Sequence, residues 1–182
     1  GVFLVMAIFG GMLAMPVLSY AIPPDVVTVP WRGLLDEDHQ TYNGKAIHLK
    51  GVAHNVAAGA TATWDPGDGS PLIPVTPNPV GGFDFDLGAI HTYPNSSDGT
   101  PFPATLEVCN NGAGPGTECS SDTYRVVVRT RTLNVEINIG IDEGLWYAHR
   151  TQTRNTSTND GAWFSQGDVS PTAGSVQAFQ IN

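Results

Sequence analysis

The sequence predicts a mainly β protein, a β-sandwich of short strands. Glycine (21 residues) and proline (14 residues) together make up about one residue in five of the 182-residue chain, which disfavours long helices. Between residues 26 and 132, short segments rich in β-branched residues alternate with turn-forming segments. About seven short strands at this spacing are typical of a β-sandwich.

The predicted strands differ in how regular their alternation is. In "AIHLKGVA" we expect Ile47, Leu49 and Val52 to point inward. The segment "PLIPV" is interrupted by proline and suits only an edge strand or an irregular crossing. The seven predicted strands span residues 26–31, 46–53, 60–64, 71–75, 83–88, 104–108 and 123–130.

The segment "FDFDLG" has a strict two-residue period. Its apolar residues Phe83, Phe85 and Leu87 alternate with Asp84 and Asp86. A strand with this pattern has one face on the core and one face in water. We therefore expect both aspartates to be exposed to solvent.

Apolar and helical patterns flank the predicted sandwich, which gives three regions: 1–22, 23–132 and 133–182. Residues 1–22 contain no charged side chain and are long enough for a membrane-spanning helix. We favour a retained apolar helix that serves as an anchor or contact; the alternative is a signal peptide cleaved after Ala21. In the last region, the pattern predicts a helix over 135–152, with Ile137, Ile141 and Leu145 on its buried face.

A loop, "NTSTNDGAWFSQGDV", is expected after this helix. Ser170 and Pro171 then form a good N-cap and first-turn pair for a second helix over "TAGSVQAFQIN". The two helices would make a helical extension of the sandwich.

Charge and cysteine content limit the classes of function. The net charge is −9 and only 8 residues are Lys or Arg, so the chain lacks the basic surface that binds nucleic acid. Cys109 and Cys119 flank a glycine-rich loop, and we expect a disulfide between the two stems of a hairpin. The alternative is a pair of free thiols in a cytosolic protein.

The stretch "TWDPGDGS" places Asp65 and Asp68 among glycines. Carboxylates in such a loop can hold Ca²⁺, with Asp84 and Asp86 as further ligands, but the alternating acidic positions and final glutamate of an EF-hand loop are missing. We favour aspartates that accept backbone N–H groups and shape a turn, with no cofactor. The five histidines have no metal-ligand spacing, and no nucleophile motif is present, so we expect no enzymatic activity.

Two short motifs of the chain, "WDPGDG" followed by "HTY", resemble motifs of the polycystic-kidney-disease (PKD) domain, an immunoglobulin-like sandwich. That family has a strand ending in Trp-Asp, then Phe-Gly-Asp-Gly, and later His-Thr-Tyr. This chain has "WDPGDG" and "HTY" at matching spacing, with Pro66 in place of the usual aromatic residue. The residues that match are Trp64, Asp65, Gly67, Asp68, Gly69, His91 and Tyr93.

The resemblance covers roughly residues 26–131 and implies a function. Domains of this family are mostly non-catalytic extracellular spacers and interaction modules. We therefore expect an exported structural module of a cell-surface or filamentous assembly. It would associate with itself, and residues 1–22 would contact a membrane or other subunits.

The C-terminal part is similar, over one repeat, to the α/α-toroid. The similar residues are "GLWYAHRTQ", "DGAWF" and "SVQAFQIN". This similarity implies the alternative function, an accessory PKD domain at the start of a larger secreted enzyme. A simple two-helix appendage packed on the sandwich accounts for the same pattern.

Overall fold

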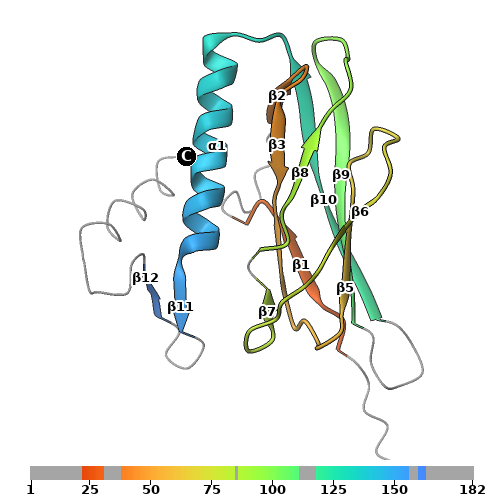
Figure 1. Ribbon diagram of the computed structural model, residues 1–182, viewed down its shortest axis with the longest axis vertical. Helices are drawn as coiled ribbons and strands as arrows, with labels where there is room; N and C mark the ends of the chain where they lie inside the picture. Colours follow the sequence, from red (N-terminus) through yellow and green to blue (C-terminus); the bar gives the residue numbers. More distant parts are fainter. Residues whose placement is uncertain (1–21, 31–37, 85, 111–117, 156–159, 163–182) are drawn as a thin grey trace, which may run out of the picture.

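A computed structural model describes residues 22–30, 38–84, 86–110, 118–155 and 160–162 of the chain. In this part the backbone forms β-strands and one helix, so the prediction of a mainly β protein is confirmed (Figure 1). The strands are β1 (Asp25–Thr28), β2 (His39–Tyr42), β3 (Ala46–Leu49), β4 (Gly51–His54), β5 (Thr61–Asp65), β6 (Ile73–Val75), β7 (Phe83–Asp84), β8 (Ala89–Thr92), β9 (Thr100–Asn110), β10 (Glu118–Arg129), β11 (Thr153–Asn155) and β12 (Asp160–Ala162), and the helix is α1 (Leu133–Thr151).

The strands that enclose the core form two layers. One layer is a five-stranded sheet in the order β2-β10-β9-β5-β6, in which β2 runs parallel to β10 and the other pairs are antiparallel. The other layer contains the sheet β1-β4-β7 and the pair β3-β8. Only Lys50 separates β3 from β4, so these two strands continue one another across a break. This arrangement is compatible with a β-sandwich.

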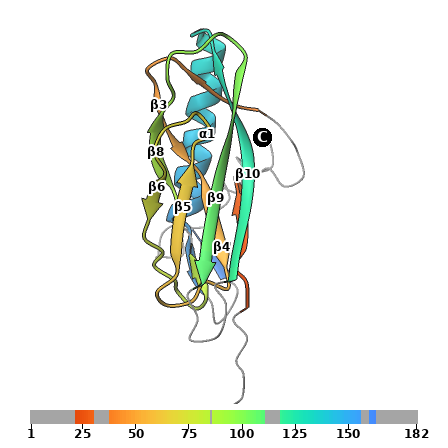
Figure 2. The same ribbon diagram turned by 90° about the vertical axis from the view of Figure 1, so that its right-hand side faces the viewer.

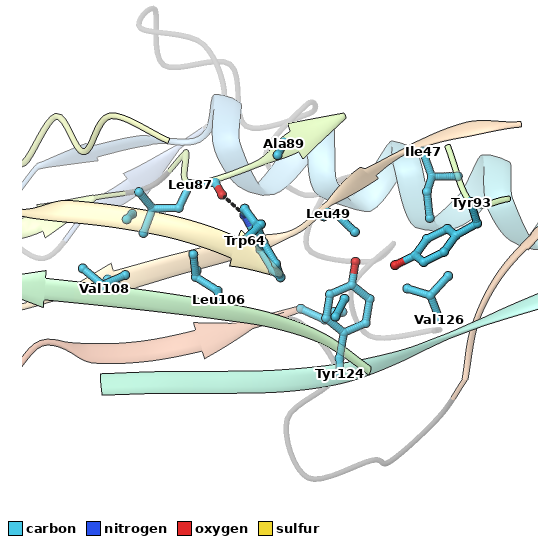
Figure 3. Packing of buried hydrophobic residues seen from close by; sticks show 14 of the residues in the cluster. Ile47, Leu49, Trp64, Leu87, Ala89, Tyr93, Leu106, Val108, Tyr124 and Val126 are labelled. Atoms are coloured by element: carbon cyan, nitrogen blue, oxygen red, sulfur yellow. Dashed lines mark hydrogen bonds between the residues drawn. The ribbon is translucent and has the colours of Figure 1, made fainter. Parts of the chain in front are cut away.

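The core lies between the two layers. Ile47, Leu49 and Leu87 from one layer pack in a single buried cluster with Trp64 and Leu106 from the other (Figure 3). Trp64 is fully buried and donates a hydrogen bond from its indole Nε1 to the carbonyl oxygen of Leu87, at 2.6 Å. Since burial of each large apolar side chain contributes about 1.5–3 kcal/mol, this cluster is the main stabilising element of the two layers.

Helix α1 covers the edge of the layers where β2 and β3 lie (Figure 1, Figure 2). Its first turn is capped by Thr132, whose hydroxyl accepts a hydrogen bond from the backbone N–H of Val135. Trp146 packs against Gly88, where a side-chain Cβ would lie 2.9 Å from the indole ring. The helix is therefore fixed closely to the second layer.

Several predicted elements are confirmed. The strands over 60–64, 104–108 and 123–130 are present as β5, β9 and β10, and β6 lies at the edge of its sheet as predicted. The predicted helix over 135–152 corresponds to α1. The predicted inward residues Ile47, Leu49 and Val52 are all buried.

Other predictions about the strands are wrong. The segment 46–53 forms two strands in different sheets, because the strand is interrupted at Lys50. The strand at 26–31 ends at Thr28, since Val29 takes a positive φ of 46°. The strands β2 and β8 were not predicted at all. Part of the predicted loop after α1 is a hairpin of β11 and β12.

The prediction of a strand over 83–88 with two exposed aspartates, based on the alternation in "FDFDLG", is also wrong in part. The strand there is limited to β7, and Asp84 is 3% exposed instead of facing water. Its carboxylate is held by the backbone N–H groups of Asn78 and Asp86, which compensate for burial. Burial nevertheless raises the pKa of Asp84 above its ordinary value. Asp86 is exposed as predicted.

The predicted buried face of the helix is wrong as well. Leu145 is buried, but Ile137 and Ile141 are 48% and 46% exposed. The buried face instead carries Val135 and Ile139. The helix has apolar residues on both sides, so the three-and-four spacing alone did not distinguish them.

Two predicted segments lie outside the described residues. They are the apolar helix at 1–22, of which only Ile22 is described, and the second helix that begins at Ser170 and Pro171. Within the part that is described, no helix is both long and apolar enough to cross a membrane.

Candidate functional site

The residues of "TWDPGDGS" form a closed turn at the end of β5. The Oδ1 atom of Asp65 accepts the backbone N–H of Gly67 at 2.9 Å, and the Oδ1 atom of Asp68 accepts the backbone N–H of Ser70 at 2.9 Å. Both aspartates therefore act as turn-forming acceptors for the residue two positions ahead. This matches the favoured interpretation of the stretch.

The two glycines of the turn serve different needs. Gly67 and Gly69 both have positive φ values, 77° and 82°. A Cβ at Gly67 would also lie 2.3 Å from the carbonyl oxygen of Pro103, whereas a Cβ at Gly69 would meet open space. Only Gly67 is required both for its backbone conformation and for close packing.

The "HTY" segment on β8 and just beyond it fastens this turn to the sandwich. His91 Nε2 lies 2.7 Å from the Oδ2 atom of Asp68, and the Tyr93 hydroxyl donates to the carbonyl oxygen of Pro66 at 3.2 Å. The rings of His91 and Tyr93 pack edge to face, with centroids 4.7 Å apart. We call Asp65, Pro66, Asp68, His91 and Tyr93 the turn cluster.

Burial and hydrogen bonding shift the titration of the turn cluster. Burial on its own raises the pKa of Asp68, but the hydrogen bonds from His91 and Ser70 outweigh it and lower that pKa below its ordinary value. Burial, together with the charges of Asp68 and Asp65, raises the pKa of Tyr93. Asp68 is thus an ionised acceptor and Tyr93 a neutral donor.

Pro66 is fully buried beneath this turn. Pro66 is therefore an internal packing position and offers no contact surface. Beside the turn, the ring of Tyr93 stacks on that of Phe102, with ring centroids 5.0 Å apart.

The structure does not gather the four aspartates considered as calcium ligands. Asp65 and Asp68 hold their own turn, Asp84 holds backbone N–H groups of its own segment, and Asp86 lies 3.5 Å from Arg150. Among the described residues, no three His, Cys, Asp or Glu side chains are grouped so that they could hold a metal ion. Three of the five histidines lie apart from one another, His54 against Phe83, His91 at the turn and His149 against Trp146, while His39 and His48 contact adjacent acidic residues of α1.

The cysteines are joined. Cys109 on β9 and Cys119 on β10 face one another in the antiparallel register and form a disulfide. The bridge joins the two stems of the hairpin, as predicted. Disulfides persist in oxidising compartments, so this bond fits an extracellular protein.

A second polar cluster, absent from the sequence predictions, lies where α1 meets the sheets. Lys50, at the break between β3 and β4, is 1% exposed. Its ammonium lies 2.9 Å from Asp142 and 2.8 Å from Glu143, two adjacent residues of α1. It also donates to the carbonyl oxygen of His48 at 2.8 Å.

Two histidines complete this group. His39 Nδ1 on β2 lies 3.0 Å from Asp142, and His48 contacts Glu143 through both its ring and its backbone N–H. We call His39, His48, Lys50, Asp142 and Glu143 the helix-edge cluster. It ties α1 to β2 and to β3 at one place.

The electrostatics of the helix-edge cluster are dominated by burial and by Lys50. Burial raises the pKa of Asp142, but the hydrogen bond from His39 and the charge of Lys50 outweigh it and lower that pKa to about 2. The pKa of Glu143 is also lowered, because Lys50 and His48 overcome the effect of burial. Both carboxylates are thus ionised at neutral pH, which makes them weak bases.

One oxygen of the cluster remains unmatched. The Oδ1 atom of Asp142 is buried and has no hydrogen-bond partner among the described residues. An open hollow of about 310 Å³ reaches Glu143 from outside and is lined by Tyr42, Lys45, Glu136, Ile139, Gly140 and Glu143. Glu143 is the one member of the helix-edge cluster that lines this hollow.

A signal for Lys50 was present in the sequence. The inward residues Ile47 and Leu49 differ by two positions, but Val52 follows Leu49 by three. Such a change of phase indicates a break in the strand, and the lysine lies within it. Its partners on α1, more than 90 residues away in the chain, had no local signal.

Comparison with known proteins adds no identification, since no protein-family model, no curated protein and no solved structure matches the chain.

Proposed function

We propose that this chain is a non-catalytic structural or interaction module of immunoglobulin-like, PKD-type architecture, exported to the cell surface or a filamentous assembly. The observation that supports it most is the use of the "WDPGDG" and "HTY" residues. Both carboxylate oxygens of Asp68 accept hydrogen bonds within the fold, from Ser70 and His91. Carboxylate oxygens that accept these hydrogen bonds stabilise the turn and are not free to act in catalysis.

The strand arrangement supports the immunoglobulin-like part of the proposal. The first strand, β1, pairs antiparallel with β4 in one layer, and β2 pairs parallel with β10 in the other. An N-terminal segment shared between the two layers, with a hairpin such as β9-β10 at the centre of the larger sheet, suits a Greek-key sandwich.

The helix-edge cluster supports the non-catalytic part. Its lysine is enclosed, and its carboxylates are ionised and already paired. A general base works best with a pKa near the operating pH, and the pKa of Asp142 lies far below it. The disulfide supports export.

Surface labelling tests the export. The chain has two lysines, Lys45 and the buried Lys50, so a membrane-impermeant amine reagent applied to intact producing cells should modify Lys45. A Lys45→Arg variant is the control for labelling elsewhere. Modification of Lys45 only after cell lysis would contradict export.

Sedimentation velocity of the whole chain tests self-association. We expect the average mass to rise with concentration over the micromolar range. A strictly monomeric chain at every concentration would remove self-assembly from the proposal. Retention of the chain by another surface protein of the same cells would then leave only the interaction function.

A further inference from the structure

The side of α1 opposite its buried face is apolar although it is exposed. Leu133, Ile137 and Ile141 are 70%, 48% and 46% exposed, and Tyr147 is 62% exposed. A surface helix normally has polar residues opposite its buried face, and one that is apolar on both sides is normally covered. We call the following uncharged residues of α1 the outer face: Leu133, Ile137, Gly140, Ile141, Gly144 and Tyr147.

Two glycines lie at the centre of the outer face. Gly140 and Gly144 are in the interior of α1, where glycine lowers helix stability relative to alanine. A Cβ at either position would meet nothing within 4 Å, so no contact in the described part of the chain requires them. Two helices approach most closely where the side chains between them are small, so this is a suitable crossing point for a second helix. The larger residues of the face lie on either side of it.

Charge on one flank of α1 is self-complementary. Glu136 and Arg150 are fourteen residues apart, which places them within about 40° of one another around the helix axis but near opposite ends of it. In its own chain Glu136 pairs with Arg131, and Arg150 lies 3.5 Å from Asp86. A second copy of the same flank, turned end to end, would bring each acidic residue close to a basic one.

This complementarity selects an antiparallel pair. When two copies of a helix pack antiparallel about a two-fold axis, the same flank of each copy faces the other, so Glu136 of one copy meets Arg150 of the second copy twice in one dimer. With Gly140 opposite Gly144, these two residues differ in height by only about 3 Å. A parallel pair would instead place this flank opposite the uncharged flank that carries Asn138.

The net negative charge of the chain does not lie at this contact. The other acidic residues of α1, Asp142 and Glu143, are turned inward and paired with Lys50. Two copies can therefore meet through their outer faces without bringing like charges together there. A pair of 19-residue helices is about 28 Å long and makes a small interface, so we expect an affinity in the micromolar range.

From these observations we propose that two copies of the chain associate through their outer faces, with the two α1 helices antiparallel and Gly140 of each copy against Gly144 of the other. This proposal rests on the self-association proposed above and gives it a surface.

Oxidative cross-linking tests the direction of the pair. Ile137 of one copy lies opposite Tyr147 of the second copy, whereas the two Ile137 residues are about 15 Å apart along the axis. A disulfide needs Cα atoms within about 7 Å. A mixture of Ile137→Cys and Tyr147→Cys chains should therefore form a disulfide-linked dimer, and neither variant alone should do so. Dimers that form in each variant alone and not between the two would show a parallel pair and overturn the proposal.

Sedimentation velocity of the whole chain tests the surface itself. Gly144→Leu introduces a good helix former, so the monomer should unfold at no lower a temperature than the unmodified chain. Its dimer dissociation constant should nevertheless rise at least about tenfold, because the added side chain lies at the crossing point and occurs twice in the dimer. Asn138→Leu is the matched control on the same helix. The Asn138 amide contacts Gln40 on β2, away from the outer face, so this variant should associate like the unmodified chain.

The outcomes separate this proposal from the proposed function. Self-association that Gly144→Leu leaves unchanged would overturn the outer-face contact and leave self-association standing. A strictly monomeric chain at every concentration would overturn both. If the chain alone is monomeric and binds a different surface protein, and Gly144→Leu abolishes that binding, the outer face serves another partner and the proposal is overturned.

Discussion

The turn cluster and the helix-edge cluster both pair a histidine with an aspartate, but they join the chain at different scales. His91 and Asp68 are 23 residues apart and fasten a turn to its neighbouring strand. His39 and Asp142 are 103 residues apart and fasten a helix to a sheet. The first cluster has no buried cation, whereas the second is built around Lys50, which is almost completely removed from water.

This difference determines what each cluster contributes. The turn cluster consists largely of hydrogen bonds to the backbone, each contributing about 1 kcal/mol. In the helix-edge cluster, the removal of one charge leaves the opposite charge buried and unpaired, which is far more costly. The helix edge should therefore be the region most sensitive to single substitutions.

The largest effect should come from Lys50→Met. Without the ammonium, Asp142 and Glu143 are adjacent carboxylates with no lysine partner, and we expect the free energy of unfolding to fall by about 3–5 kcal/mol. Urea denaturation followed by tryptophan fluorescence measures it. Lys45→Met, at a less buried lysine of the same segment, is the matched control. Equal losses in the two variants would show that the cluster contributes little.

The next largest effect concerns the turn cluster. Gly67→Ala forces a positive φ on alanine and a Cβ against the Pro103 carbonyl, and should cost about 3 kcal/mol. Gly69→Ala changes a backbone of similar φ in open space, so its cost should be about 1 kcal/mol. Thermal and urea unfolding of both variants give the difference. A Gly69→Ala variant as unstable as Gly67→Ala would mean that the contact with Pro103 is unimportant.

Acid should weaken the helix-edge cluster. The pKa of Asp142 is lowered from 3.8 to about 2 on folding, so its stabilising contribution is complete above about pH 4 and is lost as the pH falls through about 2. The shift corresponds to about 2 kcal/mol. We expect Asp142→Asn to flatten the stability profile between these pH values. Asp25→Asn, at an exposed aspartate, is the control and should leave the dependence of the unfolding free energy on pH unchanged. If that dependence stayed equally steep in Asp142→Asn, the lowered pKa of Asp142 would not be the source of the acid sensitivity.

The smallest effect should be that of calcium. Since the turn aspartates already accept backbone N–H groups, millimolar Ca²⁺ or a chelator should shift the melting temperature by less than about 1 °C. Differential scanning calorimetry measures the shift. A saturable increase of several degrees that disappears in Asp68→Asn would restore the calcium interpretation of "TWDPGDGS".

The same contrast explains how much could be predicted from the sequence. The turn cluster was accessible because its residues belong to two short motifs and because turn chemistry is local. The helix α1 was found within two residues at its start, but its buried face was not, since Ile137 and Ile141 have the same spacing as Val135 and Ile139. A periodic pattern locates a helix, and only packing determines which side is covered.

The helix-edge cluster could not be predicted because it depends on topology. Its lysine was visible only as a change of phase between Leu49 and Val52, and its acidic partners on α1 lie more than 90 residues away in the chain. Asp84 shows the same limit at smaller scale, because backbone N–H groups of its own segment satisfy a carboxylate that alternation had placed in water. Burial of a polar group follows from its partners, which periodicity does not describe.

The parallel pairing of β2 with β10 has a mechanical consequence. Four residue pairs join these strands, from His39 opposite Val126 to Tyr42 opposite Arg129. Because the strands are parallel, the chain enters β2 at one end of the pair and leaves β10 at the other. Tension applied to these flanks slides one strand along the other and loads all of their hydrogen bonds together, whereas a hairpin such as β9-β10 is peeled open one bond at a time. The pairing of β2 with β10, which are the first and last strands of the larger sheet along the chain, should therefore resist stretching because its hydrogen bonds are loaded in shear.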